Sequence, residues 1–452
     1  MPNRREIMGG TAAALFSKTV LGANDRINFA FIGLGGRTNL LDAAFRKQPD
    51  GNLAAICDVN RAKLETYQNN KLADIKVESY TDYRRILDRK DIDALLVATP
   101  DHSHAPIMIA ALEAGKDVYV EKPCSNTIGA AVSMLKAYRS HKQVVQLGTQ
   151  QRSWDHFREA AKLIWDGYIG TVNHVVVGLA GGGGGAARTV QANPAEQPVP
   201  EGLDWDAWLG PANRVPYDPR RYGGWRGYFD YGGGAITDWG VHWLDIVNLA
   251  MQTDIGAPSF TSAVSAYPGD ENPDLERVPG AWMIEYKYPK YLMSMVSFTP
   301  PTTEPIAEGP TFLGTKAWLR VSRSGFIVRM NRGSGPSRAG GPSAARGGQA
   351  PQSVAGAATA TGGGGVAQQQ QPPIEERSYL LTGEQNVAHE RASEGVHVRN
   401  FFDCIKSRQK PTAEFEIGFH STLPCLLGRQ AVKEGRALVW DETQLTAKPV
   451  AG

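Results

Sequence analysis

The sequence predicts an α/β protein of two domains, an N-terminal doubly wound parallel sheet and a C-terminal α+β domain with a mainly antiparallel open sheet. Two observations support this fold class. Up to about residue 150, short apolar runs alternate with helical patterns, which is typical of a parallel sheet covered on both faces. Later apolar runs follow one another with little helix between them, as in antiparallel sheets. A chain of 452 residues is long enough for two or three domains.

The first domain is expected to span residues 25–150. Short apolar runs predict its strands, and longer mixed runs between them predict its helices. The predicted strands are residues 27–32, 53–57, 93–98, 117–120 and 143–147, and the predicted helices are residues 39–47, 61–69 and 106–114.

The second domain is expected to span residues 151–452 and to hold the substrate-binding and oligomerisation surfaces. Its predicted strands are residues 172–178, 282–288, 292–298, 317–321 and 326–330, and its predicted helices are residues 156–166, 396–405 and 422–433. Because several strands are neighbours in sequence, we expect an open antiparallel sheet. Through this sheet the chain is expected to form a homo-oligomer, either a dimer or a tetramer.

Two segments have a composition unlike that of a folded domain. Residues 181–202 begin with five consecutive glycines and continue through a proline-rich stretch, and residues 333–373 are rich in Gly, Ala, Ser and Gln. Such segments bury too little apolar surface to offset the entropy of ordering. We therefore predict two disordered low-complexity insertions.

Residues 1–24 resemble a twin-arginine export signal. Arg4 and Arg5 precede a weakly apolar stretch of small residues, although Lys18 interrupts it. The twin-arginine route carries folded proteins with their cofactor bound, so we expect a periplasmic protein; the alternative is a ragged tail on a cytoplasmic one. No apolar run approaches the roughly 18 residues needed to cross a bilayer.

Charge and cysteine content exclude some classes of partner. The formal net charge of +2 is too balanced to indicate nucleic acid, and basic residues do not interleave with aromatics. The four cysteines are scattered without a C-x-x-C pair, which suits neither a zinc cluster nor a disulfide framework. We expect four separate buried thiols and no metal site.

A glycine-rich turn follows the first predicted strand and opens the first helix, as in a Rossmann dinucleotide site. Gly33 permits the tight turn, and Gly35 lets the backbone approach a pyrophosphate at the helix N-terminus. Gly36, Arg37 and Thr38 complete the predicted loop. Thr38 stands where the third glycine of G-x-G-x-x-G usually stands, a departure that could loosen helix–strand packing.

An acidic residue defines the expected cofactor. Asp58 ends the second predicted strand, 25 residues after Gly33, where a carboxylate accepts the ribose hydroxyls. A carboxylate repels a 2′-phosphate, so NAD is favoured over NADP. Arg37 and Arg61 are close in sequence to these residues and leave NADP possible.

Two further motifs suggest chemistry. Lys122, in Glu121-Lys122-Pro123, ends the fifth strand, at the edge where doubly wound sheets bind ligands; alternatively it is a solvated surface charge. Asp238, His242 and Asp245 are spaced four and three residues apart, which is one face of a helix. That face could be a buried polar group or an acid–base group.

Taken in order, these motifs resemble the Gfo/Idh/MocA family of nicotinamide-dependent oxidoreductases. The resemblance covers residues 27 to about 330, resumes near 396–441, and includes Thr99-Pro100 followed by His102 and His104. It implies a Rossmann domain, an open-sheet domain and hydride transfer between a nicotinamide and a carbon bearing a hydroxyl. Glu121-Lys122-Pro123 together with Asp238-x-x-x-His242 forms the specific part of the pattern.

The resemblance also assigns roles. Lys122 would bond the reacting hydroxyl and His242 would transfer its proton, while Asp238 would contact the substrate or orient His242, and Asp245 would support the site from behind. The side chains implied along the nicotinamide ribose are those of Thr99, Pro100 and His104, and Glu121 would anchor the cofactor. A base with a pKa near neutrality must reach the hydroxyl, and either His242 or a buried Lys122 could serve.

An aromatic segment precedes the histidine motif. Residues 217–231 combine Tyr, Trp and Phe with Arg and Asp and end in Tyr231, a composition that suits a carbohydrate. Arg152 and Trp154 could join the same pocket. The alternative is an aromatic loop with a purely structural role.

Three functions compete. The first is a sugar or cyclitol dehydrogenase that acts on a secondary alcohol. The second is an NAD-dependent glycoside hydrolase that works by transient oxidation, elimination, hydration and re-reduction; an exported enzyme lacks a soluble NAD pool, so a redox-neutral cycle on retained cofactor is attractive. The third is a binding module with an inert Rossmann fold, which the presence of both Lys122 and His242 disfavours.

Overall fold

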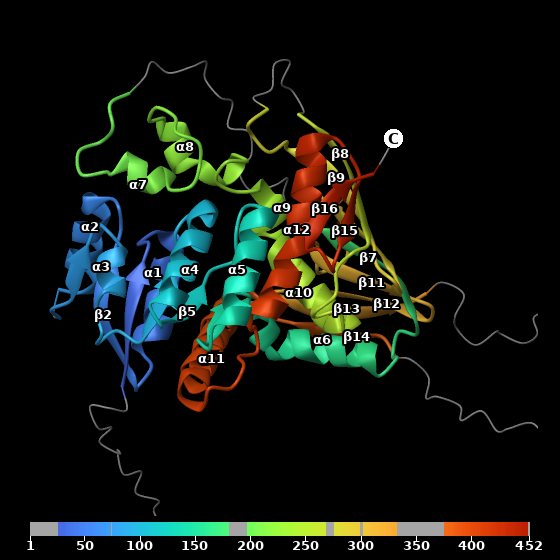
Figure 1. Cartoon of the computed structure of the whole chain (residues 1–452). Coiled ribbons are helices and arrows are strands. Elements are labelled where there is room, and N and C mark those ends of the chain that lie inside the picture. The colour runs from blue at the N-terminus through green and yellow to red at the C-terminus, as the bar shows by residue number, and fades with distance from the viewer. Residues whose placement is uncertain are drawn as a thin grey trace, which may run out of the picture.

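The computed structural model describes residues 26–73, 75–179, 197–267, 275–298, 302–331 and 375–450. These residues form two sheets separated by a layer of helices (Figure 1). The predicted fold class, a parallel sheet followed by a mainly antiparallel sheet, is confirmed. The predicted signal at 1–24 and the insertion at 333–373 lie outside the described residues. Of the segment 181–202, only residues 197–202 are described, and they form an exposed loop.

The first sheet has six parallel strands in the order β3-β2-β1-β4-β5-β6. Its strands are β1 (Ile27–Ile32), β2 (Gly51–Cys57), β3 (Glu78–Tyr80), β4 (Ala94–Val97), β5 (Asp117–Val120) and β6 (Val145–Leu147). Every residue of β4 and β5 is buried, which explains their continuous apolar runs. Strand order reverses between β1 and β4, so the crevice for a ligand opens there.

Helices cover both faces of this sheet. They are α1 (Gly36–Arg46), α2 (Arg61–Lys71), α3 (Arg84–Leu87), α4 (His104–Glu113) and α5 (Ile128–Ser140), with the short 3₁₀ turn η2 (Asp101–Ser103) before α4. Sequence reasoning missed β3, α3 and α5. The first helix begins three residues before the predicted position, because Gly35 is its N-cap.

The second sheet has ten strands in the order β14-β13-β12-β11-β7-β10-β9-β8-β15-β16. Its pairs are antiparallel except for β7 with β10. The strands are β7 (Val172–Gly178), β8 (Phe260–Ala266), β9 (Ala281–Lys287), β10 (Leu292–Val296), β11 (Gly309–Gly314), β12 (Ala317–Ser322), β13 (Gly325–Met330), β14 (Arg377–Leu380), β15 (Leu438–Asp441) and β16 (Thr446–Pro449). Sequence reasoning missed β8, β11, β14, β15 and β16.

The helical layer lies between the two sheets. It contains η3 (Gln150–Ser153), α6 (Asp155–Trp165), α9 (Gly234–Asp238), α10 (Gly240–Met251) and α12 (Phe415–Glu434). α12 packs against α5, α10 and β8 and so joins the two domains. Within the described part of the chain, no helix is long and apolar enough to span a membrane.

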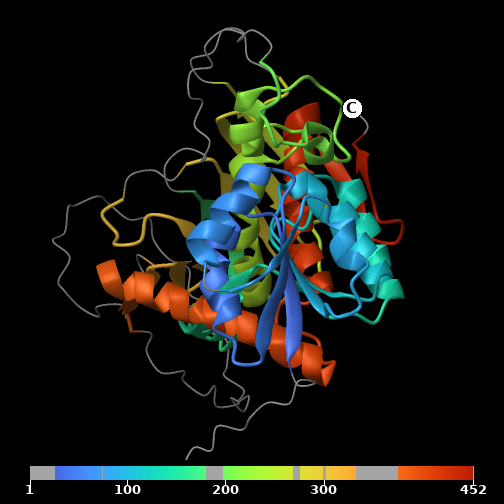
Figure 2. The same cartoon turned by 90° about the vertical axis from the view of Figure 1, so that its left-hand side faces the viewer.

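Two parts of the chain depart from a simple two-domain division. α11 (Gly383–Ser407) runs back under the first domain, where Phe401 and Phe402 join the core beneath β1 (Figure 2). The short helices α7 (Trp205–Leu209), α8 (Pro219–Gly223) and η4 (Trp225–Gly227) lie above the first domain in Figure 1. The four cysteines are buried and free, as predicted.

Candidate active site

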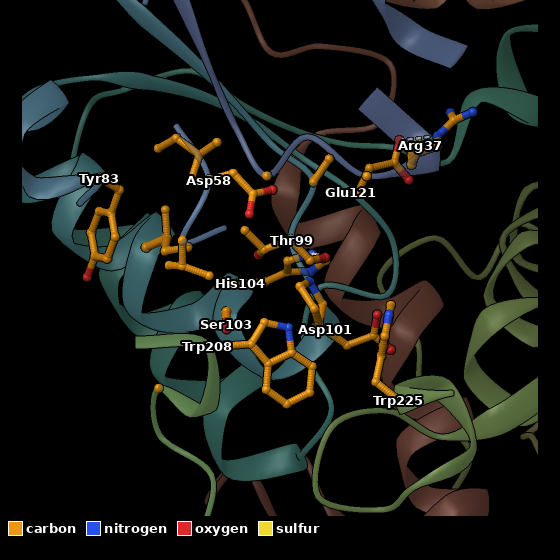
Figure 3. A pocket seen from close by; sticks show the side chains of 18 of the residues that line it. Arg37, Asp58, Tyr83, Thr99, Asp101, Ser103, His104, Glu121, Trp208 and Trp225 are labelled. Carbon is orange, nitrogen blue, oxygen red and sulfur yellow. Dashed lines mark hydrogen bonds and ion pairs between the residues drawn. The ribbon is translucent and has the colours of Figure 1, made fainter. Parts of the chain in front are cut away.

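A cleft of about 580 Å³ opens at the carboxyl ends of β1, β2, β4 and β5. One wall is the glycine turn with the strand ends, and the other is formed by α7, α8 and η4 (Figure 3). The sequence-predicted residues that line it are Gly33, Gly35, Gly36, Arg37, Asp58, Thr99, Pro100, His104, Glu121 and Lys122. The topology therefore brings together residues from four separate strand ends.

The glycine turn has the geometry of a dinucleotide loop. Gly33 has φ of +87°, and a Cβ there would lie 2.8 Å from the oxygen of Ala98, so only glycine fits. Gly35 and Gly36 face open space. Thr38 is buried, and its hydroxyl donates a hydrogen bond to the carbonyl oxygen of Gly33. The missing third glycine is thus replaced by a hydroxyl that fastens the turn.

Asp58 fixes the same loop. Its Oδ2 accepts a hydrogen bond from the backbone N–H of Leu34 at 2.8 Å, and its Oδ1 accepts one from that of Asn60 at 2.9 Å. The carboxylate lines the cleft and retains lone pairs for ribose hydroxyls. Lys63 also lines the cleft, with Nζ 5.2 Å from the ring centroid of Tyr222.

The donor set fits a nicotinamide dinucleotide. The first turn of α1 has neither a side-chain cap nor an acidic residue, so its N–H groups can face a pyrophosphate. The hydroxyl of Thr99 is buried in the cleft wall and has no hydrogen-bond partner within the described ranges. Gly33, Gly35, Asp58 and Thr99 would hold the dinucleotide.

Arg37 and Glu121 form an ion pair. Arg37 Nε lies 2.8 Å from Glu121 Oε1, and Arg37 Nη1 lies 2.7 Å from Glu394 Oε1 on α11. Burial would lower the pKa of Arg37, but Glu121 and Glu394 outweigh it and raise the pKa above its usual range. These ion pairs link α1 to the end of β5 and to α11. Because Arg37 and Glu121 bond to each other, they have fewer free hydrogen-bonding positions for the cofactor than the sequence predicted.

His104 joins the ends of β4 and β5. Its Nδ1 lies 2.8 Å from the oxygen of Pro123, and its Nε2 lies 2.9 Å from that of Thr99. Burial lowers its pKa to about 4, against the hydrogen bonds to these two carbonyl oxygens. His104 therefore links the two strand ends and shapes the cleft wall.

Lys122 and Asp238 meet at the cleft. Lys122 Nζ donates to Asp238 Oδ1 at 2.7 Å and to the backbone oxygen of Asp238 at 2.7 Å. Arg226 Nε lies 3.4 Å from the same carboxylate oxygen. Burial would raise the pKa of Asp238, but Lys122 and Arg226 outweigh it and lower the pKa. Asp238 therefore faces Lys122 and Arg226 as a carboxylate.

His242 lies apart from the cleft lining. Asp238 ends α9 and His242 is in the first turn of α10, with Trp239 between the two helices at φ −96° and ψ −35°. Trp239 keeps a helical backbone and bonds to Ala235 and Trp243 as in a helix, so the helical course continues from α9 into α10. Burial first, then the charges of Lys122, Arg323 and Arg37, lower the pKa of His242 well below its usual value. Its Nδ1 has no partner among the described residues.

Asp245 and Arg152 form a buried ion pair away from the cleft. Arg152 Nε lies 2.9 Å from Asp245 Oδ2, and Ser421 donates to Asp245 Oδ1 at 2.8 Å. Arg152 also pairs with Asp254 at 2.8 Å. Both Arg152 and Asp245 are almost fully buried, so Arg152 contacts a helix and not a ligand pocket.

Trp154 and Tyr231 also lie outside the cleft lining. Trp154 is fully buried in the core beneath the second sheet, where a large aromatic ring gains most from burial. Tyr231 is fully buried against His102 and Trp208, with ring centroids 5.2 and 4.9 Å away. The predicted pocket of Arg152, Trp154 and Tyr231 is therefore replaced by core packing.

Residues 203–231 form what we call the aromatic strap, which has its own small core and spans the cleft. Asn60 Nδ2 donates to the hydroxyl of Tyr222 at 2.9 Å, and Asp204 N donates to the oxygen of Val59 at 3.0 Å. Beyond the end of β4, His102 Nε2 lies 2.9 Å from the oxygen of Trp208. Trp208, Tyr222 and Trp225 line the cleft, so the aromatic segment serves both as structure and as pocket wall.

Sequence reasoning missed Asp101. This residue begins η2, is 5% exposed and lines the cleft between Thr99 and the strap residues Trp208 and Trp225 (Figure 3). Burial raises its pKa to about 8, although Lys122 and Arg226 oppose the rise. Its position directly after Thr99-Pro100, at the end of a predicted strand, could have indicated a cleft residue. The sequence interpretation named the neighbouring His102 and His104 instead.

Fold and site define a dinucleotide-binding α/β protein with a second, open-sheet domain. The chain belongs to the Gfo/Idh/MocA oxidoreductase family. Residues 27–149 match the family's NAD-binding Rossmann fold, and residues 156–289 match its C-terminal alpha/beta domain. The predicted family and NAD-binding domain are thereby confirmed.

Each curated relative matches only part of this chain. An inositol 2-dehydrogenase/D-chiro-inositol 3-dehydrogenase of Halalkalibacterium halodurans is 33% identical over 149 residues, 32% of this chain and 41% of the relative. A levoglucosan dehydrogenase of Pseudarthrobacter phenanthrenivorans is 37% identical over 94 residues, 21% of this chain and 24% of the relative. The matched region thus spans about two fifths or less of these relatives.

Solved structures match the whole fold. A levoglucosan dehydrogenase in complex with NADH and levoglucosan has a TM-score of 0.60 and 18% identity, covering 94% of this chain and 100% of that one. An aldose-aldose oxidoreductase from Caulobacter crescentus complexed with glycerol has a TM-score of 0.58 and 20% identity, covering 92% and 99%. At this identity the likeness shows the fold.

Proposed function

We propose that this protein is an NAD(P)-dependent oxidoreductase that transfers a hydride between a tightly bound nicotinamide cofactor and a secondary hydroxyl of a sugar or cyclitol. The observation that carries the proposal is the Lys122–Asp238 pair, 2.7 Å apart, at the strand end that faces the dinucleotide cleft. The inositol and levoglucosan dehydrogenases among its relatives support a polyol substrate. Asp58 in the cleft favours NAD over NADP.

The residues present suit this chemistry. The nicotinamide ring, when bound, supplies the hydride acceptor. Lys122, which donates a hydrogen bond to Asp238, would also donate one to the reacting oxygen and stabilise its developing negative charge. The family resemblance assigns the role of proton acceptor to His242, and burial lowers the pKa of His242 well below its usual value.

The aromatic strap supports a carbohydrate ligand. Trp208, Tyr222 and Trp225 line the cleft together with Arg226, whose guanidinium lies 4.4 Å from the ring centroid of Trp225. Flat apolar rings next to a hydrogen-bond donor suit the apolar faces and hydroxyls of a sugar ring.

The strap also favours a second candidate, redox-neutral glycoside cleavage on retained NAD. Its contacts at Asn60 and at His102 tie it down on both sides of the cleft, which would slow cofactor exchange. Nucleotide released on denaturing the purified protein would support retention, and aryl glycosides would then report cleavage. A protein that is isolated without nucleotide and cleaves no glycoside would exclude this candidate.

Two further expectations belong to the proposal. The twin-arginine motif of residues 1–24 supports export to the periplasm. The outer face of the ten-stranded sheet supports a homo-oligomer, because Val264, Met283 and Leu292 are 63%, 44% and 51% exposed there. Met283 pairs with Val264 and with Val296, so these side chains form one apolar row that a second copy could cover.

The decisive experiment is a substrate screen. Purified protein with NAD or NADP is mixed with inositols, levoglucosan and aldoses, and reduced nicotinamide is followed by absorbance. Turnover of a polyol that Lys122→Ala abolishes, with NAD binding retained, supports the proposal. Absence of turnover with every polyol, or full activity of Lys122→Ala, would defeat it.

A further inference from the structure

Arg226, on the aromatic strap, brings a second cation to the carboxylate that Lys122 contacts. Asp238 Oδ1 accepts a hydrogen bond from Lys122 Nζ at 2.7 Å, and Arg226 Nε lies 3.4 Å from the same oxygen. Because both groups contact one atom, a ligand that meets Lys122 with a hydroxyl can reach Arg226 with a group on a neighbouring carbon. Arg226 therefore belongs to the reacting end of the cleft.

The strap and α12 hold Arg226 in place. Its guanidinium lies 4.4 Å from the ring centroid of Trp225, and its backbone packs against Gly232, where a Cβ would lie 3.0 Å from the Arg226 oxygen. Arg429 on α12 donates hydrogen bonds to the oxygens of Gly232 and Phe229. A planar guanidinium that is fixed in this way loses little entropy when it binds a ligand.

The Arg226 side chain has hydrogen-bonding capacity left for a ligand. It is 48% exposed and lines the cleft, and its Nη1 and Nη2 donate no hydrogen bond to any other described residue. Trp225 covers one face of the guanidinium, so its in-plane N–H groups are the part that a ligand can meet. Two parallel N–H bonds from such a fork to a carboxylate are the strongest form of recognition by arginine.

The charges at this end of the cleft favour an anionic ligand. Lys122 and Arg226 together face one carboxylate, that of Asp238. An oxidised nicotinamide ring would add a further positive charge. A carboxylate on the substrate would offset this excess, and the attraction is stronger in a cleft partly closed to water than in bulk solvent.

Other acidic groups of the cleft offset this positive charge little. Glu121 is paired with Arg37 at 2.8 Å, and Asp58 lies at the end of the cleft away from Trp225 (Figure 3). Burial raises the pKa of Asp101 to about 8, so near neutral pH its carboxyl group is largely protonated.

We propose that Arg226 binds a carboxylate of the substrate, so that the enzyme oxidises sugar acids such as hexuronates in preference to neutral sugars. The proposal rests on the proposed function and names its substrate class. The reacting hydroxyl would lie against Lys122 Nζ, and the carboxylate, attached to the next carbon, against the Nη groups of Arg226. The carboxylate takes no part in the reaction: the hydroxyl carbon loses a hydride to the nicotinamide and the oxygen loses a proton, as with a neutral sugar.

The first test compares acids with their uncharged counterparts. D-Galacturonate, D-glucuronate and D-mannuronate are assayed with NAD against their methyl esters. We expect the preferred acid to exceed its ester in kcat/KM by roughly 10- to 100-fold, the range of hydrogen bonds to a charged group, and added salt to reduce the difference. Equal kcat/KM for acid and ester would overturn the proposal.

Variants locate the effect at Arg226. Arg226→Gln should raise KM for the acid by that factor and change the kinetics with the ester far less, and Arg226→Lys, charged but without the fork, should keep part of the preference. The matched control is Arg214→Gln, on the same strap at a 61% exposed position outside the cleft lining. An acid preference that survives Arg226→Gln, or that Arg214→Gln also removes, would overturn the assignment.

A binding measurement separates this inference from the proposed function. In calorimetric titrations, the NADH-loaded protein should bind the acid more tightly than the ester, and Arg226→Gln should remove the difference. Equal binding of both, with turnover of a neutral polyol, overturns the role of Arg226 and leaves the proposed function intact. Acid-selective binding that depends on Arg226, without turnover of any polyol or acid, supports the carboxylate site and defeats the proposed function.

Discussion

Lys122 Nζ lies 2.7 Å from Asp238 Oδ1 and 2.7 Å from the backbone oxygen of the same residue. The two residues are 116 positions apart and come from different domains. One side chain thus places a positive charge at the cleft and links β5 to the end of α9.

Removing that charge should abolish turnover. We expect Lys122→Ala to lower kcat by roughly 10²–10³-fold, since a preorganised donor to the reacting oxygen contributes on that scale. NAD affinity, measured by fluorescence titration, should change little. The control is Lys136→Ala, at an exposed position on α5. Equal activity of the two variants would contradict the role given to Lys122.

Asp101 predicts an unusual dependence of stability on pH. Its pKa is raised to about 8 in the fold, so the folded state keeps a proton that the unfolded chain releases. The associated stability is present in acid and is lost as pH rises through the folded pKa. Between about pH 5 and about pH 9, the melting temperature of the parent should therefore fall relative to that of Asp101→Asn.

Asp91 provides a control of opposite sign. A hydrogen bond from Arg89 lowers the pKa of Asp91, so Asp91→Asn should lose stability near neutral pH and recover it in acid. A constant difference between Asp101→Asn and the parent across the pH range would refute the assignment for Asp101.

The Arg152–Asp245 pair should contribute to stability and not to chemistry. Arg152→Met leaves the buried carboxylate of Asp245 without its guanidinium, and losing one partner of a buried pair costs about 3–5 kcal/mol. Urea denaturation measures this cost. The matched control is Arg214→Met, whose partner Asp206 is 84% exposed; we expect a change below about 1 kcal/mol. Comparable losses in the free energy of unfolding for the two variants would show that burial of the ion pair does not determine its contribution to stability.

The aromatic strap should control nucleotide release. Tyr222→Phe removes the hydroxyl that accepts from Asn60 and should weaken strap closure by about 1 kcal/mol, which is about a 5-fold faster release of NADH. Stopped-flow fluorescence measures the rate. Tyr217→Phe is the control, because the Tyr217 hydroxyl makes no hydrogen bond within the described residues. Identical rates of NADH release for both variants would show that the strap does not retain the cofactor.

The outer face of the ten-stranded sheet should mediate self-association. Met283→Asp places a charge in the apolar row beside Val264 and should convert the oligomer into a monomer in sedimentation velocity. The control is Ile255→Asp, an equally drastic change at a residue that is 69% exposed outside the sheet. An oligomer that survives Met283→Asp would show that the copies meet elsewhere, and a monomeric parent would exclude this interface.

Local chemistry made much of the fold predictable. The buried strands β1, β2, β4 and β5 are recognisable in the sequence as apolar runs, and the glycine turn followed by Asp58 is recognisable from its residue types and spacing. The missed strands β8, β11 and β14 mix polar and apolar residues, and their buried positions do not alternate with exposed ones. Segments of four to seven residues without that alternation lack the main sequence signal of a half-buried strand.

The contacts of the site join residues that are far apart in the chain and could not be predicted from the sequence. Sequence order placed Lys122 at a strand end, and the ion pair with Asp238 required two domains to dock. Spacing put Asp238, His242 and Asp245 on one helix face, but only the fold shows that Asp238 meets Lys122 while the Arg152 guanidinium holds Asp245 in the core. Asp101 could be recognised only after folding, because its proton affinity comes from burial among Lys122, Arg226 and Asp238. Short-range patterns decide backbone conformation, whereas burial and charge depend on residues that are remote in the chain.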